Sequence, residues 1–240
     1  RPAAPPRPRV AVFARAPEPG RVKTRLIPVL RAAEAAELYE ALLLDTIEVA
    51  ESCARTVVAF TPSGGRRLLE RLLGRHRRLL PQGPGDLGER LDRVFEILCE
   101  GGQPALVVGS DCPALTAARI RTAADRLRHT DVVIGPALDG GYYLIGLRRP
   151  RPELFRDIPW STGSVLEITR NRAREVGLRV ELLEAARDLD TPEDLYEWYA
   201  GSRSEEFAAS YPRTWHLLHS LLPPSRFAAL EESIGERSGR

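Results

Sequence analysis

The chain has 240 residues, of which 43% are hydrophobic and 28% charged, a composition typical of one large soluble globular domain. Its 35 basic and 33 acidic residues give a net charge of +2, which argues against strong attraction to nucleic acid or anionic lipid. No apolar run approaches the roughly 20 residues that a membrane span needs. Three widely spaced cysteines favour a reducing compartment, so we expect a cytoplasmic protein without membrane or nucleic-acid partners.

The first half of the chain alternates between short apolar runs and amphipathic stretches. Residues 1–8, which are rich in proline and arginine, are predicted to form a disordered tail. Continuous apolar residues predict strands at residues 9–14, 56–60 and 78–80. Apolar residues at helical spacing predict helices at residues 32–52, 65–73 and 88–100.

The second half continues this alternation and then becomes helical. Strands are predicted at residues 105–108, 132–134, 142–147 and 178–183, and helices at residues 163–176 and from the capping residue Thr116 to about Arg128. A further helix opens at Thr191-Pro192, with Asp194 as a capping residue. Residues 201–240 are expected to form a helical extension with helices at residues 211–222 and 227–234. Its apolar side chains pack either on the chain's own core or on a second copy in a homodimer.

Alternating strands and helices predict an α/β fold over residues 9–200, with three layers (α/β/α) and a mostly parallel central sheet. In open parallel sheets, ligands bind beyond the carboxyl ends of the strands. Clusters of glycine, proline, aspartate and basic residues follow four of the predicted strands, at residues 15–25, 109–113, 135–141 and 188–190. We therefore expect the functional site at this edge of the sheet.

The first loop, residues 15–25, has the composition of a phosphate-binding segment. It holds Arg15, Arg21, Lys23 and Arg25 around a Pro-Gly turn at Gly20, and Lys23 is the only lysine among the 35 basic residues. Glycine lets backbone amides approach an anion closely, and the cations neutralise its charge. The segment does not fit the P-loop pattern, which would place glycines at positions 17 and 22. An ordinary basic surface loop remains the alternative.

Aspartates follow two of the predicted strands and are candidate metal ligands. Asp111 follows the strand at residues 105–108, and Asp188 and Asp190 follow the last strand. Mg²⁺ is usually held by one or two carboxylates together with substrate phosphates. Each aspartate taken alone could equally be a turn or capping residue. Nucleophilic chemistry at Cys112 is disfavoured, because the four histidines lie in helical or tail segments.

Several motifs in these loops resemble those of the DUF2064 family. They are Val10-Ala-Val-Phe-Ala-Arg-Ala-Pro-Glu-Pro-Gly-Arg-Val-Lys-Thr-Arg-Leu26, Gly85-Asp-Leu-Gly-Glu-Arg90, Gly109-Ser-Asp-Cys-Pro-Ala-Leu115, Asp139-Gly-Gly-Tyr-Tyr-Leu-Ile-Gly-Leu147 and Ile158-Pro-Trp-Ser-Thr162. The resemblance covers roughly residues 9–200 and implies the GT-A fold of nucleotide-diphospho-sugar transferases, with glycosyltransferase activity. A looser similarity, through Asp190-Thr-Pro-Glu-Asp-Leu195, is to nucleotidyltransferases of the same superfamily.

The resemblance also implies roles for particular residues. Donor phosphates and the nucleotide would be bound by Arg15, Gly20, Arg21, Lys23, Arg25, Gly85, Glu89 and Arg90, with Lys23 and Arg25 acting in catalysis. Asp111 and Asp190 would hold Mg²⁺ or Mn²⁺. The transferred or accepting group would lie against Asp139, Gly140, Gly141, Tyr142, Trp160, Ser161 and Thr162, and Asp139 is a candidate general base. The hydroxyls at residues 161–164 could instead cap the following helix.

Three functions follow from these features. The family description narrowly favours glycosyl transfer from a nucleotide sugar to a small-molecule acceptor. The alternative is nucleotidyl transfer from a nucleoside triphosphate to a small phosphorylated or anionic substrate, with release of pyrophosphate. Ser110-Asp111-Cys112 is closer to the nucleotidyltransferase pattern, because metal-dependent GT-A glycosyltransferases usually carry Asp-x-Asp there. The third hypothesis is a nucleotide-binding module without catalysis.

Overall fold

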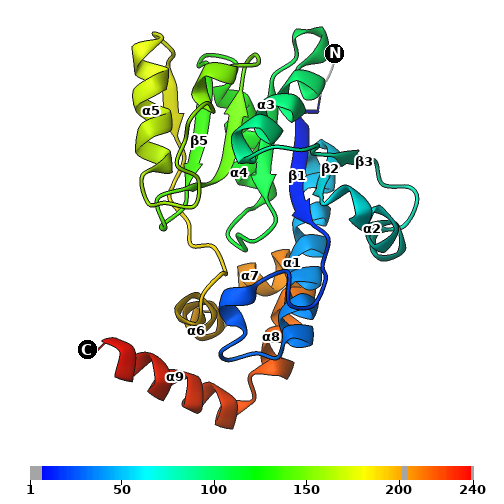
Figure 1. Ribbon diagram of the computed structural model, residues 1–240, viewed down its shortest axis with the longest axis vertical. Coiled ribbons are helices and arrows are strands. Elements are labelled where there is room, and N and C mark those ends of the chain that lie inside the picture. Colours follow the sequence, from blue (N-terminus) through cyan, green and yellow to red (C-terminus); the bar gives the residue numbers. More distant parts are fainter. Residues whose placement is uncertain (1–6, 202–204, 239–240) are drawn as a thin grey trace.

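A central mixed sheet organises the molecule, shown in Figure 1 as a computed structural model that describes residues 7–201 and 205–238. Residues 1–6 of the predicted disordered tail lie outside the described residues. Seven strands pair in the order β3-β2-β1-β4-β6-β5-β7. They are β1 (Arg9–Arg15), β2 (Arg55–Thr61), β3 (Leu79–Pro81), β4 (Ala105–Gly109), β5 (Val132–Pro136), β6 (Tyr142–Leu147) and β7 (Val180–Leu182). Only β6 pairs antiparallel with its neighbours, so the prediction of a mostly parallel sheet is confirmed.

Helices cover both faces of this sheet, because alternate residues of each strand point to opposite sides. In β1, Val10 and Val12 pack with α1 (Ala32–Cys53), α2 (Arg66–Leu73) and α4 (Ala117–Arg126). Ala11 points the other way and packs with α3 (Leu87–Leu98), while Ala173 of α5 (Val165–Glu175) belongs to the same cluster. The predicted three-layer α/β/α architecture is therefore confirmed.

The C-terminal helices lie beyond the carboxyl edge of the sheet, around the N-terminal half of α1 (Figure 1). They are α6 (Pro192–Gly201), α7 (Glu205–Ser210), α8 (Pro212–Leu221) and α9 (Pro224–Ser238), of which α7 was not predicted from the sequence. Their apolar side chains form a core with Leu38 and Leu42 of α1 and with Leu26 and Leu30, which follow the first loop. Of the two predicted packing partners, the chain's own core is therefore the one observed.

Helix boundaries depend on local chemistry that the apolar pattern describes only in part. Thr116 caps α4 as predicted, because its hydroxyl accepts a hydrogen bond from the Arg119 N–H at 3.2 Å. The capping interpretation of the hydroxyls before α5 is wrong, since Ser164 is the N-cap and makes no side-chain capping bond. In the described part of the chain, we find no helix with the length and apolar character to cross a bilayer.

Candidate active site

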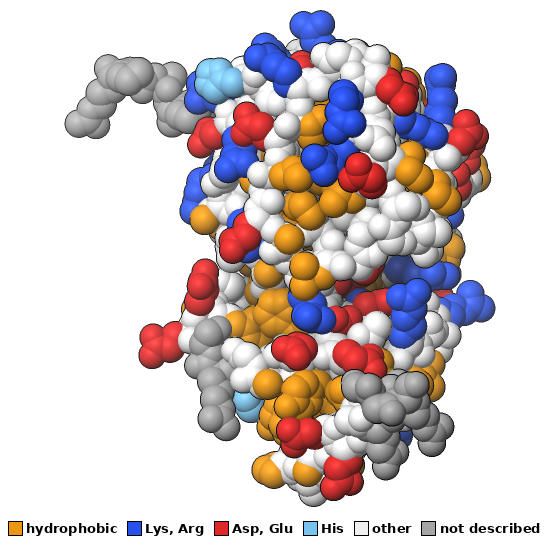
Figure 2. Space-filling model, turned by 90° about the vertical axis from the view of Figure 1, so that its left-hand side faces the viewer, with side chains coloured by type: hydrophobic (Ala, Val, Ile, Leu, Met, Phe, Trp, Pro, Cys, Tyr) orange, Lys and Arg blue, Asp and Glu red, His pale blue; other side chains and the backbone are white. Residues whose placement is uncertain are grey.

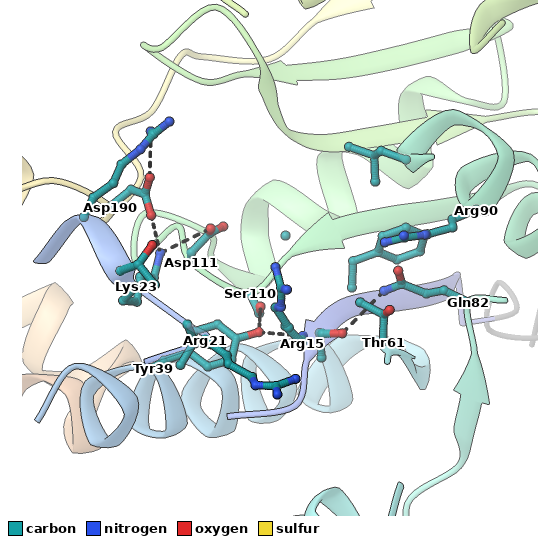
Figure 3. Close-up of a pocket in the computed structure, with 17 residues that line it drawn as sticks. Arg15, Arg21, Lys23, Tyr39, Thr61, Gln82, Arg90, Ser110, Asp111 and Asp190 are labelled. Atoms are coloured by element: carbon teal, nitrogen blue, oxygen red, sulfur yellow. Dashed lines mark hydrogen bonds and ion pairs between the residues drawn. The ribbon is translucent and has the colours of Figure 1, made fainter. Parts of the chain in front are cut away.

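A cavity of about 420 Å³ lies at the carboxyl edge of the sheet, where β1 and β4 end. Figure 2 shows acidic and basic side chains close together in the hollow between the sheet and the C-terminal helices. The cavity is elongated in Figure 3, with a charged cluster at one end and a polar group at the other. The charged cluster is Lys23, Asp111 and Asp190, and the polar group is Thr61, Gln82 and Arg90.

Lys23 bridges the two aspartates that the sequence predicts as metal ligands. Its Nζ lies 3.3 Å from Asp111 Oδ2 and 3.4 Å from Asp190 Oδ1, and only 4% of its side chain is exposed. Burial lowers the pKa of this lysine, but the two carboxylates raise it more, so the net shift is upward and the ammonium stays charged. The structure thus brings together three residues that are far apart in the sequence.

The backbone at Lys23 is as unusual as its surroundings. The residue adopts the left-handed conformation, with φ of 47° and ψ of 38°, directly before the short 3-10 helix Thr24–Leu26. This conformation is uncommon for a residue other than glycine and costs roughly 1–2 kcal/mol. It turns the side chain from an exposed loop into the buried space between Asp111 and Asp190. Functional sites are where such local strain is commonly retained.

The loops that carry Asp111 and Asp190 are tied together by the backbone. Leu189 donates its N–H to the carbonyl of Asp111 at 2.8 Å. Asp194 accepts hydrogen bonds from the N–H groups of Asp190 and Thr191, at 3.2 and 2.9 Å, which confirms its predicted capping role. Arg25 adds an ion pair to Asp190 at 3.0 Å. One main-chain bond and these side-chain contacts therefore hold the loops of the two carboxylates together.

Asp188 was named with Asp111 and Asp190 as a candidate metal ligand, but the family resemblance assigned the metal to Asp111 and Asp190 alone. One of its carboxylate oxygens, Oδ1, is buried and has no hydrogen-bond partner among the described residues. Burial, together with the charges of Asp111 and Asp139, raises its pKa to about 8. Asp188 therefore lies close enough to Asp111 for their negative charges to repel when both are ionised.

The buried, unpartnered carboxyl oxygen of Asp188 beside Asp111 is the observation that fits a divalent cation. The described residues contain no group of three or more acidic, cysteine or histidine side chains arranged to enclose a metal ion. Asp111 and Asp190, whose side chains are 39% and 35% exposed, could hold a cation only together with oxygens from a substrate. That is the usual arrangement for Mg²⁺ with a phosphorylated substrate.

A hydrogen-bonded chain of buried hydroxyls supports the middle of the cavity. The Arg15 N–H donates to the Tyr39 hydroxyl at 2.9 Å, and this hydroxyl also bonds to Ser110 Oγ at 2.8 Å. Burial raises the pKa of Tyr39, so it remains protonated. The contact links the end of β1 to the residue before Asp111. Arg15 and Arg21 both line the cavity, as the sequence predicted.

The far end of the cavity offers both donors and apolar surface. Gln82, which was not predicted, is buried and its Nε2 donates to the carbonyl of Ala59 at 2.7 Å. Arg90 lines the cavity, and its buried Nε has no hydrogen-bond partner among the described residues. Leu87 adds an apolar surface. A planar polar group would satisfy Arg90 here.

The other residues predicted for nucleotide binding lie outside the cavity lining. Gly20 is an exposed turn residue with a positive φ of 76°. Glu89 forms a capping box with Asp86: each side chain accepts a bond from the other's N–H, at 2.9 Å. Gly85 packs against this glutamate, and its positive φ of 98° favours glycine. Gly85 and Glu89 therefore shape the start of α3, and their contact with a nucleotide stays a prediction.

The predicted acceptor residues form two adjoining loops beside the charged cluster. Asp139 accepts a hydrogen bond from the Gly141 N–H at 2.9 Å, and Gly140 packs closely against the backbone of Gly163. Trp160 meets the partly buried Tyr142 edge to face, at 6.5 Å between ring centroids. Exposed hydroxyls at Ser161 and Thr162 complete these loops. None of these residues lines the cavity, although the charge of Asp139 reaches Asp188.

Comparison with known proteins identifies the family. Residues 45–162 match the family described as "Uncharacterized protein conserved in bacteria (DUF2064)". A relative from Phenylobacterium zucineum (strain HLK1) is 30% identical over 210 residues, which cover 80% of this chain and 92% of the relative. The chain belongs to the DUF2064 family. The family resemblance noted in the sequence is therefore confirmed.

The relatives of this DUF2064 protein carry two kinds of name. The Phenylobacterium zucineum protein is named 3-phospho-D-glycerate guanylyltransferase. A crystal structure from Desulfovibrio desulfuricans G20, named provisionally as a nucleotide-diphospho-sugar transferase, is 30% identical with a TM-score of 0.85. It covers 92% of this chain, which in turn covers 97% of it.

More distant structures share the fold. A nucleotidyl transferase from a Methanothermobacter species superposes with a TM-score of 0.54 at 21% identity, covering 84% of this chain and 98% of its own. A cytidylyltransferase from Leptospira borgpetersenii gives a TM-score of 0.55 at 13% identity, covering 92% and 97%. At this level of identity the likeness concerns the architecture alone.

Proposed function

We propose that this protein is a nucleotidyltransferase that joins a nucleoside triphosphate, in the first instance GTP, to a small phosphorylated acid. The observation that carries the proposal is Lys23, buried between Asp111 and Asp190 at one end of an elongated cavity. The name of the relative from Phenylobacterium zucineum supports nucleotidyl transfer. This reverses the narrow preference for glycosyl transfer that rested on the family description.

The reaction needs charge neutralisation more than proton transfer. A phosphate oxygen of the acceptor forms a bond to the α-phosphorus of the triphosphate. The bond between that phosphorus and the oxygen bridging to the β-phosphorus breaks, and pyrophosphate leaves with the electron pair. Because the attacking phosphate is already ionised near neutral pH, no general base is required at Asp139. The main task is to hold several negative charges together in line.

Lys23 and Arg25 are placed for this task. The Lys23 ammonium is nearly excluded from water, where its attraction to a phosphate is stronger than at an exposed position. Arg25 has a side chain that is 65% exposed, and its guanidinium can turn from Asp190 toward an incoming triphosphate. Asp111 and Asp190 would hold Mg²⁺ or Mn²⁺, which supplies further positive charge to the phosphates when bound.

The opposite end of the cavity would take the base. The unpartnered Nε of Arg90 lies there, and arginine pairs readily with the O6 and N7 acceptors of guanine. Arg15 and Ser110 lie between the two ends in Figure 3, at the level of the ribose. The acceptor would approach from the loops of Asp139 and Trp160, next to the charged cluster.

The products distinguish this function from its competitors. The purified protein would be incubated with Mg²⁺, each nucleoside triphosphate and 3-phosphoglycerate, and separately with nucleotide sugars and candidate acceptors. Acceptor-dependent pyrophosphate release is expected. Release of nucleoside diphosphate from a nucleotide sugar would instead support glycosyl transfer, which the name of the Desulfovibrio desulfuricans relative favours. Nucleotide binding without any product would indicate a binding module.

A further inference from the structure

A second cavity, of about 840 Å³, opens at the other edge of the sheet, where β1 and β2 begin. It has twice the volume of the candidate active site and lies within the range of roughly 300–1,000 Å³ typical of small-molecule sites. β1 is seven residues long, so its two ends are about 20 Å apart. Figure 1 shows the length of this strand between the two edges of the sheet, and the two cavities share no lining residue, so they are separate.

The lining of this second cavity is strongly basic. Seven arginines and a single acid, Asp125, give it a charge of +6. The whole chain carries only +2, so the residues outside the cavity sum to −4. The net positive charge of the chain is therefore accounted for by the lining of this cavity, although the candidate active site also holds basic side chains.

Most of these arginines are not used by the fold. Arg9 donates to the carbonyls of Leu98 and Glu100, and Arg128 lies 3.9 Å from Asp125. The other five have no ion pair among the described residues; they are Arg7, Arg55, Arg121, Arg148 and Arg149. Some arginines elsewhere do pair with neighbouring acids, such as Arg31 at the N-cap of α1 and Arg170 on α5. Like charges that converge without a counter-charge destabilise a fold and become favourable when an anion binds.

We propose that this arginine-lined cavity binds a small polyanion with at least two phosphoryl groups, at a site distinct from the candidate active site. Guanidinium groups recognise phosphate oxygens through paired hydrogen bonds. A single phosphate dianion would offset only a third of the cavity's charge. A long nucleic acid would extend beyond the cavity to residues whose charges sum to −4, whereas a compact polyphosphate would remain inside the cavity.

The test uses the full chain, sodium tripolyphosphate as the probe and calorimetry without divalent cations. The double variant Arg121→Gln/Arg149→Gln should bind the probe at least about tenfold more weakly, because each lost charge-assisted bond is worth about tenfold or more. The matched control is Arg67→Gln/Arg71→Gln on α2, which removes the same charge from exposed positions outside both cavities. It should retain the parent affinity.

A third variant separates this site from the active site. Lys23→Ala should keep the binding event that Arg121 and Arg149 control. The two double variants should unfold at the parent temperature, whereas Lys23→Ala should not. Equal losses in the two double variants would show a general charge effect and overturn the proposal. Three other results would also overturn the proposal. They are loss of all binding in Lys23→Ala alone, no measurable binding to the parent, and displacement of the probe by a short RNA at a concentration lower than that of the probe.

Discussion

Replacement of Lys23 tests the central element of the candidate site. Its ammonium lies 3.3 and 3.4 Å from two carboxylates and is 4% exposed, so it is held in place before substrate arrives. Removal of one preorganised donor from a charged transition state costs about 2.7–4 kcal/mol, or about 10²–10³ in kcat. A full charge in a buried position should act at the upper end. We therefore expect Lys23→Ala to lower pyrophosphate release about 10³-fold.

The left-handed backbone supplies a matched control. Lys23→Gly removes the same ammonium, but glycine adopts φ of 47° without the cost that alanine has. The glycine variant should be more stable than the alanine variant by about 1 kcal/mol, which raises its Tm by about 2–4 °C in a protein of this size. Both should be equally inactive.

The measurements are steady-state pyrophosphate release and thermal unfolding on the same preparations. Turnover of Lys23→Gly within tenfold of the parent would refute the assignment. A glycine variant that regains activity in proportion to its regained stability would show that the lysine acts through the fold. Circular dichroism on each variant establishes that the sheet is intact before rates are compared.

Three further predictions concern the metal, the C-terminal helices and pH. Asp190→Asn should abolish turnover. In the parent protein, chelation should remove the activity and added Mg²⁺ should restore it, whereas the variant should stay inactive. Activity that chelation does not affect would argue against a metal. Asp45→Ala removes a fully buried carboxylate that accepts from Thr214 N and Oγ1, both at 2.8 Å. This substitution should lower the free energy of unfolding by about 3 kcal/mol and Tm by roughly 10 °C. The control Asp125→Ala should leave Tm unchanged. Hydrogen bonds from Arg226 lower the pKa of Glu34 far below its ordinary value of 4.5. A carboxylate with a lowered pKa stabilises the fold above pH 4.5, and this stability is lost as the pH falls below that value. Glu34→Gln should therefore reduce the change of Tm between about pH 5 and pH 3. The same change of Tm in variant and parent would contradict this.

The convergence of Lys23, Asp111 and Asp190 could be predicted because it follows from topology. Parallel strands end at the same edge, so the position of a loop in the sequence is enough to place its side chains there. The architecture was predictable for the same reason, since the alternation of strands and helices determines it. A strand's direction is not encoded in its apolar pattern, and the antiparallel β6 could not be recognised as such.

Other parts of the site depend on packing that periodicity does not describe. The buried Gln82 and the unpartnered Arg90 nitrogen follow from the position of α3 against β3. Glu89 looked like a nucleotide ligand in its motif, yet its carboxylate lies in a capping box. Asp188 was among the candidate aspartates, but its burial is a tertiary property that the sequence pattern does not describe. Glycosyl and nucleotidyl transfer could not be separated, since both require the same phosphate-binding groups.

The helices after residue 190 have a consequence for how the protein can be dissected. Tyr211 donates to the carbonyls of Cys112 and Leu115, directly after Asp111, and Leu26 after the first loop lies in the same apolar core. The C-terminal helices therefore support both loops of the candidate active site. A chain that ends at residue 200 would therefore not be a minimal active fragment. The loops at the carboxyl edge of the sheet would lose their packing partners, and leucines of α1 and of the segment after the first loop would be exposed to water.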